Sequence, residues 1–321
     1  MDLGHCPAWP ARPSALRAGA HLLAWLVCLG SALPAQAASP AVEGSSSRED
    51  RQTAIDSIPL DKLEETAKTK VNQVLKDVSI YRRMPVEVVR CNPELYLFLV
   101  NRPDAVVNLW EVLGISEVHL RQVGKNTYRA DDGHGTLCDF EFLYRSHDFH
   151  VIHAEGSYVG PLFNRQIKGK CLMTLRSGFV KETDGNYYVT HRLDAFCKLD
   201  NVGADLLAKT IHPLVGKVCD RNFTEISAFM GSISRKVEHD EDWGHQIAAK
   251  LENVHPSVRE ALTKLITKLA RQTEEREARE GVKTAARDRD SGPKGKPVPP
   301  RSEEKSATEK SPSKPTKTET K

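Results

Sequence analysis

The sequence lacks the motifs that usually reveal an enzyme or a metal protein. Its cysteines form no C-x-x-C pair, which argues against a zinc knuckle or a thioredoxin-like redox site. It has no glycine-rich loop that would cradle a phosphate, no Ser-His-Asp order and no paired carboxylates. No catalytic residue, metal site or cofactor is therefore predicted. The formal net charge of +3 over 321 residues is nearly balanced, which disfavours nucleic acid as a partner.

Long apolar runs are also missing, except at the amino terminus. Residues 1–37 combine a weakly basic start, the apolar run AGAHLLAWLVCLGSALP and the small-residue site Ala35-Gln36-Ala37. This pattern predicts a secretory signal peptide that is cleaved after Ala37. The apolar run is shorter than the roughly 20 residues that span a bilayer comfortably, and no later segment predicts a transmembrane helix. We expect an extracytoplasmic protein, secreted or periplasmic, without an integral membrane span after signal cleavage.

Signal cleavage would leave five cysteines in a compartment where disulfides persist: Cys91, Cys138, Cys171, Cys197 and Cys219. The text KETDGNYY predicts a hairpin with the three-residue loop 183–185 and with Gly185 in the left-handed conformation. The register that follows places Cys171 opposite Cys197, within the reach of a disulfide. Whether the two cysteines bond depends on the direction of their side chains.

Three histidines recur at intervals of three in HDFHVIHAEG, residues 147–156. In a strand, His147 and His153 could share one face while His150 would point to the other, and only a helix would gather all three. The aromatic and β-branched residues around them favour strand and turn. We therefore interpret this segment as a turn with partly exposed imidazoles and predict no metal site there.

The two ends of the mature chain differ in composition from its middle. Residues 38–80 are predicted to form a polar linker followed by an arm helix from about 60 to 78. One face of that helix is apolar: Leu63, Ala67, Val71 and Leu75. Residues 282–321 consist mainly of Lys, Glu, Pro, Ser and Thr, which cannot bury enough surface to offset chain entropy, so this tail is predicted to be disordered.

Residues 81–240 are predicted to form one domain of ordinary size. It opens with a strand over 81–91, followed by a helix that Asn92 caps and Pro93 starts. A second short helix runs from Pro103 to Gly114. Alternating β-type runs separated by short turns then predict antiparallel strands over 117–123, 126–130, 135–145, 149–159, 167–180 and 186–199.

The strand over 135–145 has one nearly apolar face, made by Cys138, Phe140, Phe142 and Tyr144. Something must cover that face, and the next segment is suited to do so. Residues 202–230 predict a helix with a broad apolar stripe and a disturbance at His212-Pro213. We expect this helix to lie across the sheet.

Residues 241–281 predict a helical appendage, a pair of helices broken at His255-Pro256. The second helix carries a narrow apolar stripe of Val258, Leu262, Leu265, Ile266 and Leu269. Because the stripe lasts for less than three heptads, docking on the domain's own surface is favoured over a coiled coil.

This order of elements resembles the START-like helix-grip superfamily (SRPBCC), also called the Bet v 1-like or polyketide-cyclase-like group. The resemblance is carried by NPELYLFLVNRPDAVVNLWEVLG, by GTLCDFEFLYR with the strands after it, and by DAFCKLDNVGADLLAKTIHPLVGKVCDRNFTEISAFM. It covers about residues 84–230 and implies an α+β fold in which an antiparallel meander grips a long C-terminal helix. Members bind lipids, sterols, hormones or polyketide-like aromatics between sheet and helix, and a few catalyse cyclisation or dehydration there.

The resemblance implies a ligand cavity, and ten residues are candidates to line it: Trp110, Phe140, Phe142, Tyr144, Met173, Tyr187, His191, Leu193, Leu207 and Ile211. For the apolar members, plain core packing is the competing interpretation. His191 is the best polar candidate, because it shares a predicted strand face with apolar neighbours. A buried imidazole there could orient a ligand or act as an acid or base, or it could be a hydrogen-bonded core histidine.

Three hypotheses of function follow. The first is an exported, non-catalytic protein that binds an apolar small molecule or lipid in a helix-grip cavity. The alternative is a structural or interaction domain of the cell envelope whose core is filled. The third is a polyketide-cyclase-like enzyme, for which His191 with Tyr187 or Tyr144 is the only polar set that the sequence offers.

Overall fold

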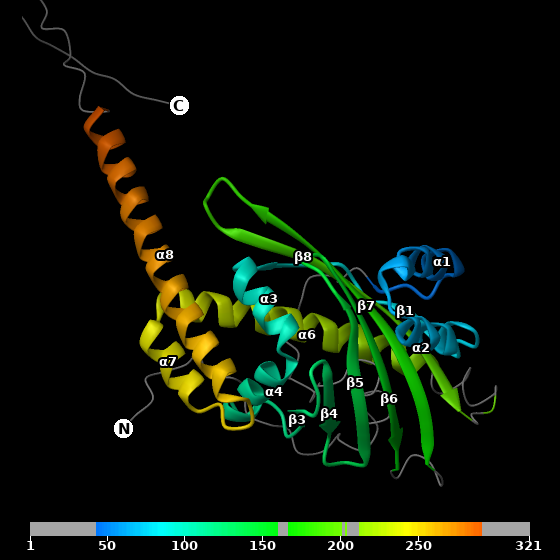
Figure 1. Ribbon diagram of the computed structural model, residues 1–321. Helices are drawn as coiled ribbons and strands as arrows, with labels where there is room; N and C mark the ends of the chain where they lie inside the picture. Colours follow the sequence, from blue (N-terminus) through cyan, green and yellow to red (C-terminus); the bar gives the residue numbers. More distant parts are fainter. Residues whose placement is uncertain (1–42, 160–165, 201–202, 204–211, 291–321) are drawn as a thin grey trace, which may run out of the picture. The chain divides into compact units, whose positions relative to one another are not determined.

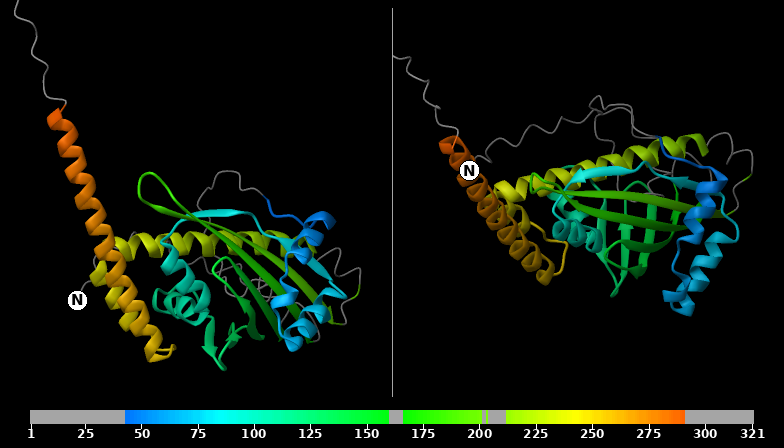
Figure 2. Two further views of the ribbon diagram at one scale, coloured as in Figure 1. Left: turned by 45° about the horizontal axis from the view of Figure 1, so that its top comes forward. Right: turned by 90° about the horizontal axis from the view of Figure 1, so that it is seen from above.

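The computed structural model describes residues 43–159, 166–200, 203 and 212–290, and it shows an α+β fold (Figure 1). A single antiparallel sheet has the strand order β1-β8-β7-β6-β5-β4-β3, and β2 pairs with β8 beside β1. The long helix α6 (His212–His239) packs along one face of this sheet (Figure 2). The predicted fold class, an antiparallel meander gripping a long C-terminal helix, is confirmed.

The strands follow the predicted runs closely. The described strands are β1 (Ile80–Arg83), β2 (Glu87–Arg90), β3 (His119–Gln122), β4 (Thr127–Asp131), β5 (Thr136–Arg145), β6 (Phe149–Tyr158), β7 (Ile167–Lys181) and β8 (Tyr187–Asp200). The single strand predicted over 81–91 is wrong, because it is split into β1 and β2. Pro85 stands at the break, where it has no N–H to donate to β8.

The two short helices begin and end where their caps predicted. In α3 (Pro93–Asn101), the Asn92 side chain accepts a hydrogen bond from the Glu94 N–H at 2.9 Å. Helix α4 (Pro103–Val112) is followed by Gly114, whose φ of 68° is the left-handed conformation that glycine adopts without strain. Both helices pack into the main core together with α6.

Helix α6 is tethered to the first strand by an ion pair. The Arg82 guanidinium contacts the Asp220 carboxylate, which also accepts the Gly44 N–H at 3.0 Å. The helix that was predicted over 202–230 is confirmed from residue 212 and continues to His239. Leu207 and Ile211 lie outside the described residues, so their predicted place beside a ligand is untested.

The opposite, outer face of the sheet is covered by the N-terminal helices α1 (Arg48–Asp56), η2 (Leu60–Lys62) and α2 (Glu65–Leu75). Leu63, Ala67 and Val71 are buried there, as the predicted apolar face requires. Helix α1 was not predicted, because its sequence is polar and only Ala54 in it is buried. It starts at Ser47, whose hydroxyl accepts the Asp50 N–H at 3.0 Å.

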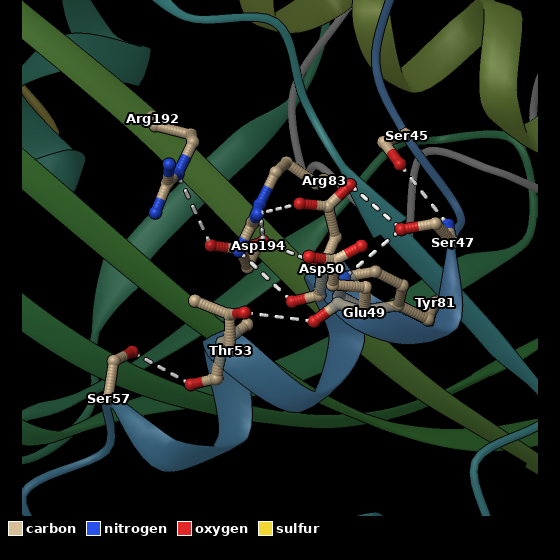
Figure 3. Close-up of polar contacts among 11 residues, drawn as sticks. Ser45, Ser47, Glu49, Asp50, Thr53, Ser57, Tyr81, Arg83, Arg192 and Asp194 are labelled. Carbon is tan, nitrogen blue, oxygen red and sulfur yellow. Dashed lines mark hydrogen bonds and ion pairs between the residues drawn. The ribbon is translucent and has the colours of Figure 1, made fainter.

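A polar cluster on the outer face fixes α1 to the sheet (Figure 3). Asp194 of β8 is 4% exposed and accepts hydrogen bonds from the Tyr81 hydroxyl and the Arg83 Nε, both at 2.7 Å. Arg83 also pairs with Asp50 of α1. Arg83 of β1 therefore links the first helix to β8.

The helical appendage docks on the domain itself. Helix α7 (Glu241–Ala249) and helix α8 (Pro256–Asp290) are separated at His255-Pro256, as predicted. The stripe of α8 joins the main core through Val258, Leu262, Ile266 and Leu269. The chain divides into two compact units, residues 1–276 and residues 277–321, so the docked part of α8 belongs to the same unit as the sheet. The predicted domain limits themselves stay a prediction.

Within the described part of the chain, no helix combines the length and the apolar character needed to cross a membrane.

Candidate functional site

The inner face of the sheet, the face toward α6, gathers most of the predicted cavity residues. Phe140 and Phe142 of β5, Met173 of β7 and Leu193 of β8 lie in the core that α6 covers. Trp110 of α4 meets Phe229 of α6 edge to face, with ring centroids 5.8 Å apart. These apolar residues therefore lie together in the main core, and their role as ligand surface stays a prediction.

Some apolar side chains of this inner layer are not fully closed off from solvent. Ile152 of β6 and Leu175 of β7 lie in the middle of the sheet, yet their side chains remain partly exposed. Val218 and Ile226 of α6 are also only partly buried. On the outer face of the same strands, Val151 and Leu172 are 0% exposed. Apolar surface is thus left accessible on the inner face of the sheet.

His191 is part of a buried hydrogen-bond network inside this core. Its Nδ1 lies 2.9 Å from the Tyr96 hydroxyl, and its Nε2 lies 2.7 Å from the Ser227 Oγ. Tyr96 also meets the Ser177 Oγ at 2.8 Å, and Ser227 donates to the Phe223 carbonyl at 2.7 Å. The network joins α3, β7, β8 and α6.

The electrostatics of His191 favour a packing role. Burial lowers the pKa of its imidazole to about 4, so the ring is neutral near pH 7. Both ring nitrogens already have partners, which leaves neither free to contact a ligand. Sequence reasoning missed Tyr96, Ser177 and Ser227. The sequence does contain a signal for Ser227, because this polar residue interrupts an otherwise apolar helix stripe between Phe223 and Phe229.

The tyrosines proposed beside His191 lie elsewhere. Tyr187 stands near the end of the β7–β8 hairpin, where it pairs with Lys181, whose ammonium lies 5.1 Å from the ring centroid. The expectation that Tyr144 shares the face of Phe142 is wrong. The register of β5 shifts between these two residues, so Tyr144 pairs with Val151 and packs on the outer face. A β-bulge of this kind reverses the face of every later residue in the strand.

The same bulge turns Arg145 inward, beside His150. The two residues are direct cross-strand partners of β5 and β6. The Arg145 Cζ lies 3.8 Å from the centroid of the Phe142 ring, and the His150 ring meets that ring edge to face at 6.2 Å. In the described part of the chain, Arg145 Nε and Nη2 and both nitrogens of His150 are buried without a hydrogen-bond partner.

The interpretation of residues 147–156 as a turn with partly exposed imidazoles is wrong for two of the three histidines. His150 is 0% exposed and His153 is 4% exposed, because β6 begins at Phe149 and lies in the middle of the sheet. As strand spacing requires, they point to opposite faces, and His153 Nδ1 lies 3.7 Å from Glu141. Among the described residues, no group of three or more His, Cys, Asp or Glu side chains could hold a metal ion.

The predicted pairing of Cys171 with Cys197 is confirmed as a register. The two residues are Cα partners in β7 and β8, and Gly185 in the connecting loop has a φ of 79°. Their Sγ atoms lie 2.7 Å apart on the inner face. Cys219 of α6 is buried near them, and burial raises the pKa of its thiol far above the ordinary value.

Comparisons with known proteins find neither a matching family model nor a similar curated protein. Solved structures do match. A conserved protein from Geobacillus kaustophilus is 14% identical, with a TM-score of 0.33 over 47% of this chain and 93% of that one. The Zhui aromatase/cyclase from Streptomyces sp. R1128 is 10% identical, with a TM-score of 0.29 over 50% and 98%. The lipid transfer and protein localization domain of human StarD13 is 11% identical, with a TM-score of 0.26 over 46% and 75%. The helix-grip arrangement expected from the START-like resemblance is present in the strand order and in the placement of α6.

Proposed function

We propose that this protein binds an apolar small molecule or lipid between the inner face of its sheet and helix α6, without catalysis. The observation that carries the proposal is the partly exposed apolar surface of Ile152 and Leu175 on the inner face of the sheet, together with that of Val218 and Ile226 on α6. Apolar surface of this kind is stabilised when a ligand removes it from water, by about 25 cal/mol for each Å². The proposed setting is outside the cytoplasm, after cleavage of residues 1–37.

The hydrogen bonds of His191 support the non-catalytic form of this proposal over a cyclase. A catalytic acid or base needs a nitrogen within reach of the substrate, and here Tyr96 and Ser227 occupy both. The two tyrosines that would complete a catalytic set lie on the other face of the sheet and near the end of a hairpin.

Titration with a neutral fluorescent dye tests this proposal. Dye emission should rise and shift to the blue on binding to the wild-type protein. Leu175→Trp should lower the affinity at least tenfold, because the larger ring occupies the accessible inner surface. Leu137→Trp is the matched control, since Leu137 is 53% exposed and alternates with the inward-facing residues of β5.

An outcome in which wild type and Leu175→Trp bind the dye equally would place the dye elsewhere and contradict the proposal. If the wild-type protein does not bind the dye and Leu175→Trp lowers the melting temperature, the inner layer is a filled core. The cell-envelope structural hypothesis would then be favoured.

A further inference from the structure

Arg145 and His150 form a polar pair on the inner face that the core does not satisfy. Both come from the β5–β6 hairpin, where they are direct partners across the ladder. Around them stand Phe142, the Tyr128 ring and, opposite His150 on β7, Leu175. The pair therefore borders the accessible apolar surface on which the proposed function rests.

Within the described part of the inner face, the positive charge of Arg145 has no counter-ion. Among the described residues, no carboxylate forms an ion pair with Arg145. Of the acidic groups that act on the neighbouring Tyr128 and His150, Asp104 pairs with Arg102 and Asp148 accepts the Ser146 hydroxyl. Arg145 is partly exposed as a residue, but its Nε and Nη2 atoms are buried without a partner, and leaving buried donors unpaired costs free energy.

The unpartnered atoms of Arg145 also have a specific geometry. Nε and Nη2 lie on one edge of the guanidinium, and this edge is the fork that binds a carboxylate through two parallel hydrogen bonds. His150 adds one N–H donor, because burial and the nearby Arg145 charge lower the pKa of its imidazole to about 4 and keep the ring neutral. The Tyr128 hydroxyl interacts with the Arg145 guanidinium, but Nε and Nη2 of Arg145 and both nitrogens of His150 have no hydrogen-bond partner among the described residues.

The neighbouring side chains indicate what the rest of the ligand is made of. Ile152 is two residues from His150 on the same strand face, and Leu175 is the direct partner of His150. Both keep accessible apolar surface. An acidic group held by Arg145 would therefore continue into an apolar body over Ile152 and Leu175.

We infer that Arg145 and His150 bind the carboxylate of an apolar carboxylic acid whose hydrocarbon part lies on the inner face of the sheet. This inference rests on the proposed function and narrows its ligand to acids. It adds a charged recognition element to a surface that would otherwise select only for apolar character.

Matched pairs of probes test the inference. Oleic acid and oleyl alcohol have the same chain and differ in the head group, so calorimetric titration of the full chain with each isolates the contribution of the carboxylate. The wild-type protein should bind oleate at least tenfold more tightly than the alcohol. Arg145→Gln should abolish that preference and leave the alcohol affinity within about twofold of wild type.

Arg176→Gln is the control variant. Arg176 lies over the Phe149 ring at 4.9 Å on the outer face, so it matches the stacking of Arg145 without facing the ligand. It should keep the full preference for oleate. The melting temperature of ligand-free Arg145→Gln should equal or exceed that of wild type, because the substitution removes two buried donors that have no partner. Oleate should then raise the melting temperature of wild type by more than that of the variant.

The outcomes separate the two claims. Equal affinity of the wild-type protein for acid and alcohol would overturn the acid inference while leaving the proposed apolar binding intact. Retention of the oleate preference by Arg145→Gln would also overturn it. Failure of both probes to bind would contradict both claims. If Arg145→Gln does not fold, the shift of the His150 ring resonances in wild type decides, since oleate should move them and oleyl alcohol should not.

Discussion

The Tyr96 hydroxyl and the His191 Nδ1 lie 2.9 Å apart in the middle of the main core, where they join helix α3 to strand β8. Tyr96 is 0% exposed and His191 is 3% exposed. The imidazole also forms a hydrogen bond with Ser227 of α6. The His191 side chain therefore links α3, β8 and α6. These contacts favour a structural role for His191.

His191→Ala is expected to lower the free energy of unfolding by about 1 to 3 kcal/mol, because it removes buried hydrogen bonds and leaves a cavity. Urea unfolding measures this directly. His119→Ala is the control, since the His119 side chain is 71% exposed, and it should change stability by less than about 0.5 kcal/mol. A His191→Ala protein with wild-type stability but altered turnover of a substrate would contradict the structural role.

Stability should also fall in a defined pH window. Burial lowers the pKa of His191 and of His150 to about 4, below the ordinary value of 6.5. The unfolded chain therefore binds protons that the native chain does not, and the free energy of unfolding decreases as the pH falls from about 6.5 to about 4. Above pH 6.5 these two groups contribute no slope. Denaturant unfolding of wild type and His191→Phe at several pH values checks this, and the variant should show the shallower slope.

Cys171 and Cys197 are expected to form a disulfide in an oxidising compartment. Their sulfur atoms lie 2.7 Å apart on neighbouring strands, so little movement is needed to bond them. Mass spectrometry after alkylation of the unfolded, unreduced protein should find these two thiols blocked. Cys197→Ser should lower stability by ~2 to 4 kcal/mol under oxidising conditions and by much less with a reductant. Free alkylation of both thiols in exported protein would contradict the prediction.

The N-terminal helix should detach when its anchor is removed. Asp50→Ala breaks the contact of α1 with Arg83, and hydrogen exchange of α1 amides should accelerate while the exchange of β8 stays unchanged. Asp194→Ala should have a larger effect and lower the free energy of unfolding by ~3 to 5 kcal/mol. It leaves the mostly buried Arg83 and the Tyr81 hydroxyl without their shared acceptor. Equal effects of the two substitutions on global stability would show that Asp50 and Asp194 act as one unit.

Much of the fold could be predicted because its signals are local. The caps at Asn92 and Gly114 and the loop at Gly185 depend on neighbouring residues only, and the Gly185 turn was enough to place Cys171 opposite Cys197. Strand alternation likewise placed Phe140 and Phe142 on the face that α6 covers. These features need no knowledge of distant contacts.

The features that could not be predicted from the sequence depend on tertiary contacts. The bulge after Phe142 adds one residue to β5, and no turn or glycine in the sequence marks it. It places Tyr144 on the outer face, against the prediction, and turns Arg145 inward. Helix α1 was missed because an ion pair with Arg83, 33 residues away, holds it to the sheet while its own sequence has little apolar character.

The most direct test of apolar binding is mass spectrometry of organic extracts from gently purified protein, with Leu175→Trp prepared in parallel. We predict that wild-type protein retains one apolar species in near-stoichiometric amount and that the variant, folded to the same melting temperature, retains less than a tenth of it. An extract of wild-type protein that contains no more organic material than the extract of Leu175→Trp would contradict the account.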